Sequence, residues 1–593
     1  MNAIARGIVG VLACTLMASS SFAAQTVGFL KLEGELPERE VMAPFLFAKP
    51  DGLTFRGVIE TLDSVASDPK LSGVVVRLVE PQLSLSRVEE IGAAFRRIRS
   101  AGKKVHVFTE IYDQSAVVLG SFADEVIVQS GGAVTLTGVY MEEMFLADML
   151  KWVGVTPDFV QIGDYKGAKE MFANSKPSPE WDQNLNQLLD SMYAHVREHI
   201  KSGRKINDQQ LDAAMSEGLF MEPGDAVKFG IVDAEADRLG LDDHLKRVYG
   251  DDFRWELGLG EPEGAPDFSR MGLFEAFSQI MKALEDLGGG TVRDTIAVVH
   301  IDGPIMDGKS SNGSFLSGAT VGSLTIREQL KKIEDDDHVK GVIVRINSPG
   351  GSAIASESIW LGLRRIAERT KKPVWVSVGS MAASGGYYIA VAGDKIYVNP
   401  SSIVGSIGVV GGKLAMGGLY EKLHINAVPR ARGPLGGIMS GLAPWTEAER
   451  GAITRSMKRT YDQFVDRVTK GRKGIDVSKT AEGRIFTGDK AIALKMADEI
   501  GGLDDAVSDM ASALKLSDGQ FDVLDYPPPM TLSEMFENGL PFGAASPKIE
   551  AVESLRSAIG PGSWDAVADA MQALLQLRDE PILLAMPRVV VFR

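Results

Sequence analysis

The chain has 593 residues, of which 45% are hydrophobic and 24% charged, a mixture typical of globular domains and not of a disordered chain. Its 63 Lys+Arg and 79 Asp+Glu give a net charge of −16, which argues against a broad nucleic-acid-binding surface. The single cysteine, Cys14, excludes a disulfide framework and a cysteine-based metal cluster. His195 and His199 have i, i+4 spacing without a third zinc ligand, so we expect them on a solvated helix face. At roughly 150 residues per domain, the length predicts two to four folded units.

The first residues have the pattern of an export signal. Arg6 precedes the apolar stretch Gly7–Ala18, and the segment Ser-Ser-Ser-Phe-Ala-Ala, which is rich in small residues, follows it up to Ala24. The stretch is shorter than the about 20 residues of a comfortable membrane span, which favours cleavage over permanent anchoring. A loose lipobox that ends at Cys14 keeps lipid attachment open as an alternative. We therefore predict that residues 1–23 are a signal peptide or short membrane anchor.

Two halves of the chain repeat one another in order and at a nearly constant spacing. The segment Gly73–Leu78 reads GVVVRL, and Gly341–Ile346 reads GVIVRI. Further matches follow in the same order, and they pair Arg96-Arg97-Ile98 with Arg364-Arg365-Ile366, Gly138-Val139 with Gly408-Val409, Tyr193 with Tyr461, and Gly218 with Gly483. Such self-similarity indicates a tandem duplication.

Both copies alternate short apolar strands with helical segments. The expected strands are Val27–Leu32, Val74–Leu78, Val105–Phe108 and Val126–Val128 in the first copy, and Ile296–Ile301, Val342–Ile346, Val374–Val378 and Ile396–Val398 in the second. This alternation predicts an α/β fold with buried parallel sheets. We expect one domain over residues 24–249 and another over 295–529, joined by a linker over 250–294 with a helix at Leu273–Leu287. A tail over 530–593, with two helices and the apolar end Pro581–Phe592, has no predicted role.

The copies differ in a glycine-rich loop that follows their second strand. In the second copy the strand runs into Asn347–Ser352, which contains Gly350 and Gly351 after a proline. The corresponding segment Val79–Ser84 has no glycine. Because glycine lets backbone N–H groups approach a ligand closely, the loop of the second copy could bind an oxyanion.

A second difference concerns a serine at a strand-to-helix turn. Ser384 lies among small residues in Gly379–Tyr388, and the first copy has Gln114 at the matching position. The helix N-terminus at this point would favour developing negative charge. The motif differs from the Gly-x-Ser-x-Gly elbow because position 382 is Ala382. Small residues at such a turn often serve only close packing, but two features lost together in the first copy indicate catalysis, with Ser384 as nucleophile.

A serine nucleophile needs a base, and the sequence offers two candidates. His424 follows Tyr420–Leu423, which is typical of the exposed end of a helix. Lys166 lies in Gly163–Ala168, and the corresponding segment Arg432–Gly436 has no lysine. Burial can turn a lysine into a base because desolvation disfavours the ammonium. Composition alone does not distinguish Lys166 from other lysines.

Taken in order, these motifs resemble the Clp/crotonase superfamily, and residues from about 24 to 529 resemble its family of long, duplicated signal peptide peptidases. The motifs that carry the resemblance are Asn347–Ser352, Met381–Tyr388, Pro400–Val409 and Gly163–Ala168. It implies a tandem duplication of a Clp/crotonase-like ββα-type domain. Carried over by residue, it implies Ser384 as nucleophile and Lys166 as a general base supplied by the first copy. The oxyanion-binding and lysine-supporting residues that it implies are Gly350, Gly351, Gly385 and Ser406.

The resemblance also implies an activity and a setting. The expected activity is a serine endopeptidase that hydrolyses signal peptides and other apolar unfolded peptides through an acyl-enzyme, without metal or cofactor. The expected assembly is a homo-oligomer, a tetramer, at the membrane surface on the periplasmic side of the bacterial inner membrane, with no nucleic-acid partner. Three alternatives stay open: a Ser–His peptidase that uses His424, a crotonase-type acyl-thioester enzyme, and an inactive membrane-side scaffold.

Overall fold

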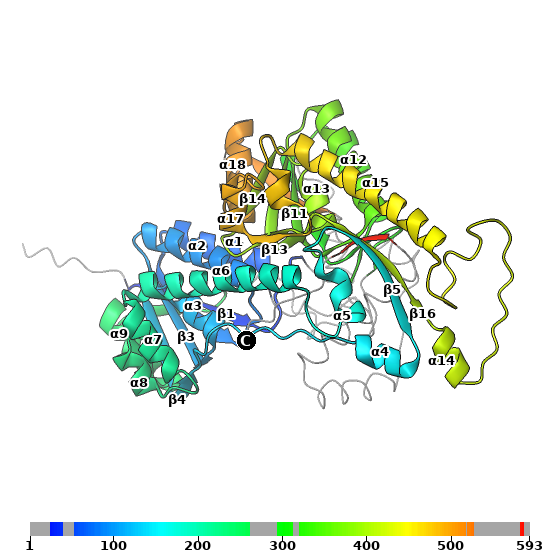
Figure 1. The fold of residues 1–593 in the computed structure, drawn as a ribbon. Coiled ribbons are helices and arrows are strands. Elements are labelled where there is room, and N and C mark those ends of the chain that lie inside the picture. The colour runs from blue at the N-terminus through cyan, green and yellow to red at the C-terminus, as the bar shows by residue number, and fades with distance from the viewer. Residues whose placement is uncertain are drawn as a thin grey trace, which may run out of the picture.

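The computed structural model describes residues 24–39, 53–260, 293–311, 319–517, 519–526 and 582–585 (Figure 1). The predicted export signal with Cys14, the predicted helix Leu273–Leu287 and the tail apart from Ile582–Ala585 lie outside the described residues. Within the part of the chain that is described, no helix combines the length and apolar character that crossing a membrane requires.

The first half is built around a six-stranded sheet in the order β6-β4-β3-β2-β1-β7, in which all neighbours are parallel. The strands are β1 Thr26–Glu33, β2 Leu71–Val79, β3 Lys104–Tyr112, β4 Glu125–Val134, β6 Ala234–Ala236 and β7 Arg254–Glu256. The helices of this half include α1 Phe55–Ser67, α2 Leu85–Ser100, α3 Gln114–Gly120, α6 Pro179–Arg204, α7 Asp208–Ser216, α8 Pro223–Lys228 and α9 Leu241–Tyr249. Val74 and Val76 pack on one face of the sheet and Val75 on the other, so the strands are buried on both sides.

The second half repeats this topology. Its larger sheet contains β18-β14-β13-β11-β8-β19, all parallel, which is the order of the first sheet copied strand by strand. These strands are β8 Asp294–Asp302, β11 Val339–Ser348, β13 Val374–Ala383, β14 Lys395–Val398, β18 Glu499–Ile500 and β19 Phe521–Tyr526. Two additional strands, β15 Ile403–Gly405 and β17 Ile485–Thr487, extend the sheet beyond the end of β13. The predicted α/β duplication and parallel sheets are confirmed, whereas the domain boundaries stay a prediction.

Helices cover the second sheet as they cover the first (Figure 1). They are α11 Ser323–Asp335, α12 Ala353–Thr370, α13 Gly385–Ala390, α15 Glu447–Gly471, α16 Val477–Thr480, α17 Gly488–Ala493 and α18 Leu503–Leu514. The helix α12 begins at the N-cap Ser352, whose hydroxyl accepts from the backbone N–H of Ala355. This cap fixes the start of α12 directly after the glycine-rich loop.

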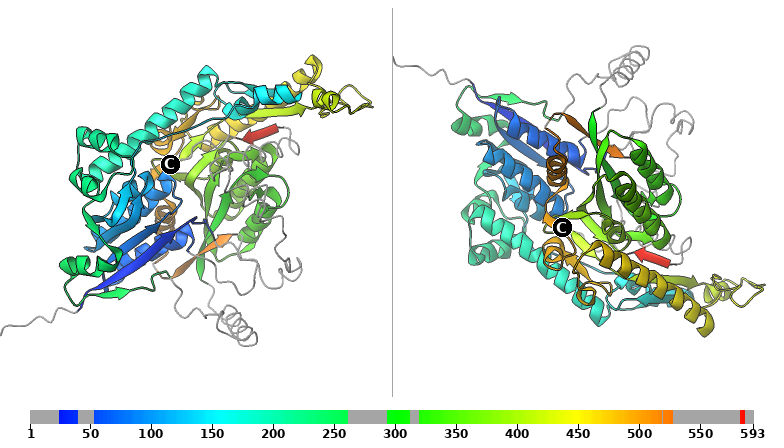
Figure 2. Two further views of the ribbon diagram at one scale, coloured as in Figure 1. Left: turned by 90° about the horizontal axis from the view of Figure 1, so that it is seen from below. Right: turned by 90° about the horizontal axis from the view of Figure 1, so that it is seen from above.

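A third sheet joins the two halves, in the order β10-β9-β12-β20-β16-β5 (Figure 2). Its strands are β5 Thr156–Ile162, β9 Ile305–Met306, β10 Val321–Gly322, β12 Gly350–Ser352, β16 Val409–Ala415 and β20 Ile582–Ala585. Only β5 comes from the first half, and it pairs antiparallel with the whole length of β16. Beyond that ladder lie α4 Ala147–Val153 and α14 Gly417–Lys422, and α5 Glu170–Ala173 packs beside β5 (Figure 1).

A buried ion cluster also connects the halves. Arg345 on β11 is 1% exposed and donates to Glu38 at 3.2 Å and to Glu90 at 2.9 Å, both from the first half. Burial alone would raise the pKa of Glu38, but the charges of Arg345 and Arg87 outweigh it and lower that pKa to about 2. Burial raises the pKa of Glu90, and Arg345 offsets only part of this effect. The contact between the halves therefore includes buried ion pairs of Arg345 with Glu38 and Glu90.

Of the two histidines on α6, His195 contacts the second half directly, and His199 contacts Glu89 of its own half, which in turn bonds Ser401 of the second half. The ring of His195 contacts the Ser401 hydroxyl at 2.9 Å, and that of His199 contacts the Glu89 carboxylate at 3.0 Å. The expectation of a solvated helix face is therefore wrong for these two residues. A helix face covered by another part of the chain has the same polar pattern as one covered by water.

Candidate active site

The first half delivers Lys166 into the second half through the β5–β16 ladder. Ile162 pairs with Val409 at the end of β5, and Lys166 follows after a short turn. A Cβ placed on Gly408 would lie 3.1 Å from the Lys166 Cδ, and one on Gly483 would lie 2.4 Å from its backbone nitrogen. These two glycines leave the space through which the lysine enters the interior.

Neither Gly408 nor Gly483 was predicted as a site residue from the sequence. The repeat pairs them with Gly138 and Gly218 of the first copy, so a signal was present. A Cβ on Gly218 would lie 2.2 Å from the Leu136 carbonyl oxygen, which shows that close backbone packing at this point is common to both copies. Because the glycine is present in both copies, comparing the copies does not indicate that Gly483 also leaves space for Lys166.

Ser384 lies at the turn between β13 and α13 in a strained backbone conformation. Its φ of 53° and ψ of −112° are rarely adopted by a non-glycine residue. The backbone N–H of Ser384 donates to the carbonyl of Gly405 at 2.8 Å, which ties the turn to β15. The residue thus has the sharp strand-to-helix turn of a nucleophile elbow without the Gly-x-Ser-x-Gly motif.

The structure brings Lys166 and Ser384 into direct contact. The distance from the Lys166 Nζ to the Ser384 Oγ is 2.6 Å. Nζ also lies 2.9 Å from both the hydroxyl and the carbonyl oxygen of Ser406. Lys166 is 1% exposed and Ser384 is 0% exposed. Desolvation by burial lowers the pKa of Lys166 well below its ordinary value, which favours the neutral amine.

The three glycines expected at the oxyanion site lie together beside this pair. Gly350 and Gly351 have φ values of 102° and 150°, in the region that favours glycine. A Cβ on Gly385 would lie 3.2 Å from the Gly350 Cα and from the Gly351 nitrogen. The hydroxyl of Ser348 accepts from the Gly350 N–H at 3.2 Å and helps to hold the loop.

Because the glycine-rich loop is expected to bind an oxyanion, Gly351→Ala should lower kcat for peptide hydrolysis by about 10²- to 10³-fold, the typical cost of removing one oxyanion donor. A Cβ on Gly351 would lie 1.9 Å from the Ile305 carbonyl oxygen, so the loop has to move. Steady-state kinetics with a chromogenic peptide measure the change. Gly437→Ala is the matched control because no described atom lies within 4 Å of its added Cβ. Equal kinetics for Gly351→Ala and the native chain would contradict a role for this loop.

The other candidate base lies on the surface. His424 is exposed and follows α14, with its backbone N–H donating to Glu421 at 3.1 Å. The expectation that it lies at the exposed end of a helix is confirmed. Gln114, which the first copy has opposite Ser384, is buried and accepts from the Gly138 N–H at 3.0 Å. The first copy thus uses the equivalent turn for a structural hydrogen bond.

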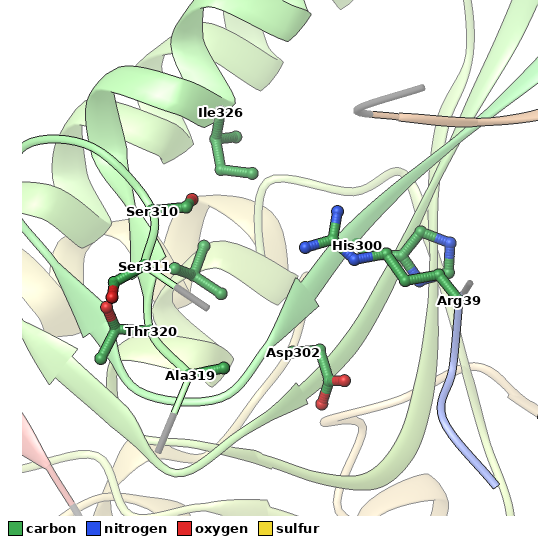
Figure 3. A pocket seen from close by; sticks show the side chains of 9 residues that line it. Arg39, His300, Asp302, Ser310, Ser311, Ala319, Thr320 and Ile326 are labelled. Atoms are coloured by element: carbon green, nitrogen blue, oxygen red, sulfur yellow. The ribbon is translucent and has the colours of Figure 1, made fainter. Parts of the chain in front are cut away.

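A small cavity lies at the edge of the third sheet, beside β9 and β10 (Figure 3). Its volume is about 30 Å³, enough for a water-sized molecule and far too small for a peptide. Its polar lining residues are Arg39, His300, Asp302, Ser310, Ser311 and Thr320. His300 already bonds Asp525 at 2.8 Å, and Asn347 donates to Asp302 at 3.0 Å. Among the described residues, no group of three or more His, Cys, Asp or Glu side chains is arranged to hold a metal ion.

A duplicated α/β fold with a buried serine against a buried amine, beside a glycine-rich loop, defines the class of Clp-like serine peptidases. The model of peptidase family S49 matches residues 97–245 and 366–517, one match in each copy, and the Clp protease model matches 319–404. The chain belongs to peptidase family S49 and is a serine peptidase.

Curated relatives agree with this assignment. The chain is 31% identical to "Protease 4" of Haemophilus influenzae over 461 residues, which are 76% of this chain and 71% of that protein. It is 28% identical to "Protease 4" of Salmonella typhi, over 78% of this chain and 73% of that protein. It is 34% identical to "Putative signal peptide peptidase SppA" of Enterococcus faecium, over 41% of this chain and 70% of that protein.

Proposed function

We propose that this serine peptidase is an endopeptidase that hydrolyses signal peptides and other apolar, unfolded peptides after export, with Ser384 as nucleophile and Lys166 as general base. The observation that carries the proposal is the 2.6 Å contact between the Lys166 Nζ and the Ser384 Oγ, made across the two halves in a buried site. The name of the Enterococcus faecium relative supports the substrate class.

The contacts of Lys166 suit a neutral amine. A neutral amine has two N–H bonds and one lone pair, and Nζ has three polar neighbours. The two N–H bonds donate to the carbonyl and the hydroxyl of Ser406, each at 2.9 Å. The lone pair then accepts the hydroxyl proton of Ser384 at 2.6 Å. Ser406 is therefore a positioning residue that directs the lone pair of the base.

The reaction is acyl transfer. Nζ removes the Ser384 proton while Oγ attacks the carbonyl carbon of the scissile bond. The negative charge on the former carbonyl oxygen is stabilised by backbone N–H groups from Gly350 and Gly351 of the glycine-rich loop and from Gly385 of α13. The Lys166 ammonium then protonates the leaving amine as the C–N bond breaks. Water, deprotonated by the same amine, hydrolyses the acyl-enzyme and regenerates the hydroxyl.

An acylating serine-directed probe tests this function. We expect one probe molecule per chain, attached to Ser384, when the full chain is digested and analysed by mass spectrometry after reaction. Lys166→Met should label far more slowly because its side chain cannot accept the proton. Ser380→Ala is the matched control, since Ser380 bonds Ser84 of the first half at 2.7 Å and is outside the dyad. Peptide hydrolysis by a chain whose Ser384 stays unlabelled would contradict the proposal.

The pH dependence of kcat/KM should report the deprotonation of Lys166. Because only the neutral amine is a base, activity rises with pH and levels off once the pH exceeds the pKa of Lys166. Burial lowers that pKa well below 10.5, so the plateau begins well below the pH at which an exposed lysine deprotonates. Initial rates across acidic to alkaline pH measure the profile. A rate that rises only near pH 10.5 would contradict a buried lysine base.

We also propose a homo-oligomer, a tetramer, that acts at the periplasmic membrane surface. The support is an arm formed by α4, α14 and the segment that follows α14, which carries Met149, Trp152, Leu423, Ile425 and Val428, each at least 49% exposed. Clustered exposed apolar side chains are typical of interaction surfaces. Sedimentation of the full chain and of a Trp152→Ser variant would measure the assembly.

A further inference from the structure

The C-terminal segment Ile582–Ala585 forms β20, which lies inside the third sheet and not at its edge (Figure 2). It pairs antiparallel with β12 on one side and with β16 on the other. Within the described sheet, β12 and β16 are joined only through β20. Neighbouring strands lie about 4.8 Å apart, so the two flanking strands leave space for one extended chain.

Both flanking strands belong to the site. The strand β12 is Gly350–Ser352, the glycine-rich loop itself. The strand β16 begins directly after Ser406–Gly408, which contact Lys166, and it carries the ladder to β5. The groove between β12 and β16 therefore runs between the proposed oxyanion loop and the proposed base.

The register places the tail at the level of the nucleophile. Ala585 pairs with Gly350, and Leu584 pairs with Gly351. A Cβ on Gly385, the residue after Ser384, would lie 3.2 Å from Gly350 and Gly351 backbone atoms. Ser384 itself is 0% exposed. A peptide bond cannot reach a fully buried Oγ unless something beside it moves.

We propose that Ile582–Ala585 is an intramolecular competitor of the substrate: it occupies, as an added strand, the groove in which an extended peptide binds, and the substrate must displace it. The proposal rests on the proposed function, because it takes this groove as the substrate path. Addition of a strand to open sheet edges is a common mode of peptide recognition. Because the segment is tethered, its effective concentration is high without any strong contact.

The sequence of the segment fits this role. It reads Ile-Leu-Leu-Ala, which is apolar and uncharged like the proposed substrates. Pro581 precedes it and Pro587 follows Met586. Because proline has no N–H to donate to a ladder, these residues limit how far the pairing can extend. Short pairing makes displacement by a longer peptide feasible.

A binding experiment in the Ser384→Ala background tests the proposal without requiring turnover. The probe is a fluorescein-labelled peptide with the sequence of residues 578–593, and fluorescence anisotropy gives its Kd for the full chain. Adding Leu583→Pro and Leu584→Pro removes two successive N–H donors, which point to opposite neighbours in a strand. We expect this variant to bind the probe at least about tenfold more tightly, because the tethered competitor is lost.

The matched control places two prolines beyond the paired residues, Val589→Pro and Val590→Pro, and its Kd should equal that of the parent. Equal Kd values for the parent and the Leu583→Pro/Leu584→Pro variant would overturn the proposal. Weaker binding with a lower Tm would also overturn it, because β20 would then be a structural strand. Loss of the tail from the native chain but not from Ser384→Ala, seen by intact mass, would make the segment a substrate and overturn its inhibitory role.

Hydrogen exchange supplies a second measurement on an unaltered tail. In Ser384→Ala, a saturating apolar peptide of unrelated sequence should speed exchange in the fragment that contains Ile582–Ala585. Unchanged exchange at saturation would overturn the proposal. A chain that binds peptides and releases its tail but never hydrolyses peptides would refute the proposed function alone.

Discussion

Replacing Ser384 with alanine is expected to lower peptide hydrolysis by about a million-fold while the fold persists. The substitution removes the Oγ that lies 2.6 Å from the Lys166 Nζ and leaves the backbone bond to Gly405 in place. Lys166→Ala should be about as inactive, because an alcohol without a base is a poor nucleophile. Initial rates with a chromogenic peptide measure both.

The double variant Lys166→Ala/Ser384→Ala should be no less active than either single variant, because groups that act as a unit are strongly non-additive. Ser380→Ala, on the strand β13 that leads to Ser384, should keep a rate close to that of the native chain. If losses in the double variant were multiplicative, the two residues would act separately, and the dyad would be refuted. An inactive His424→Ala beside an active Lys166→Ala would favour the Ser–His alternative.

Arg345→Met is expected to destabilise the chain by about 3–5 kcal/mol, because it leaves the buried Glu90 without a counter-ion and leaves Glu38 with Arg87 alone. Glu38 and Glu90 are both at most 5% exposed, and Arg345 lies between them. Urea unfolding followed by fluorescence measures the midpoint. Activity should fall as well, because the same cluster joins the half that carries Lys166 to the half that carries Ser384.

Arg77→Met is the matched control from the duplicated position in the first half. Arg77 pairs with Glu110 at 2.6 Å, and the Glu110 side chain is 41% exposed. Because the carboxylate of this pair faces water, its loss should cost far less than that of the buried cluster, and ion pairs open to water contribute about 0–1 kcal/mol. Similar unfolding midpoints for the two variants would show that the buried cluster does not hold the halves together.

Much of the fold could be predicted because its signals are local. Each central strand is a short apolar run, and the repeat of GVVVRL as GVIVRI aligns the copies. The Gly350–Gly351 loop and Ser384 were also recognisable, because the first copy lacks them. The fold class and the candidate nucleophile can therefore be predicted from short sequence motifs.

The proposed base could not be chosen from the local sequence pattern. Lys166 becomes buried only because β5 pairs with β16, a contact between segments far apart in the chain. In isolation, Gly163–Ala168 has no feature that distinguishes its lysine from a solvated one. The burial of Arg345 could not be predicted from local sequence either. Its strand has nearly the same sequence as that of Arg77, and the contacts with Glu38 and Glu90 distinguish the two environments. The strand β20 likewise forms by pairing with β12 and β16, and its short apolar sequence alone does not predict this pairing.

The division of the site between two copies with the same strand order has a consequence for how activity responds to dilution. A chain with a single copy could bring an equivalent serine and lysine together only by meeting another molecule, so its active fraction would fall as it is diluted. Here the covalent connection between the copies makes that encounter intramolecular. Under the proposed dyad, the first copy needs to contribute only Lys166, and the second copy needs to contribute only Ser384 and the glycine-rich loop.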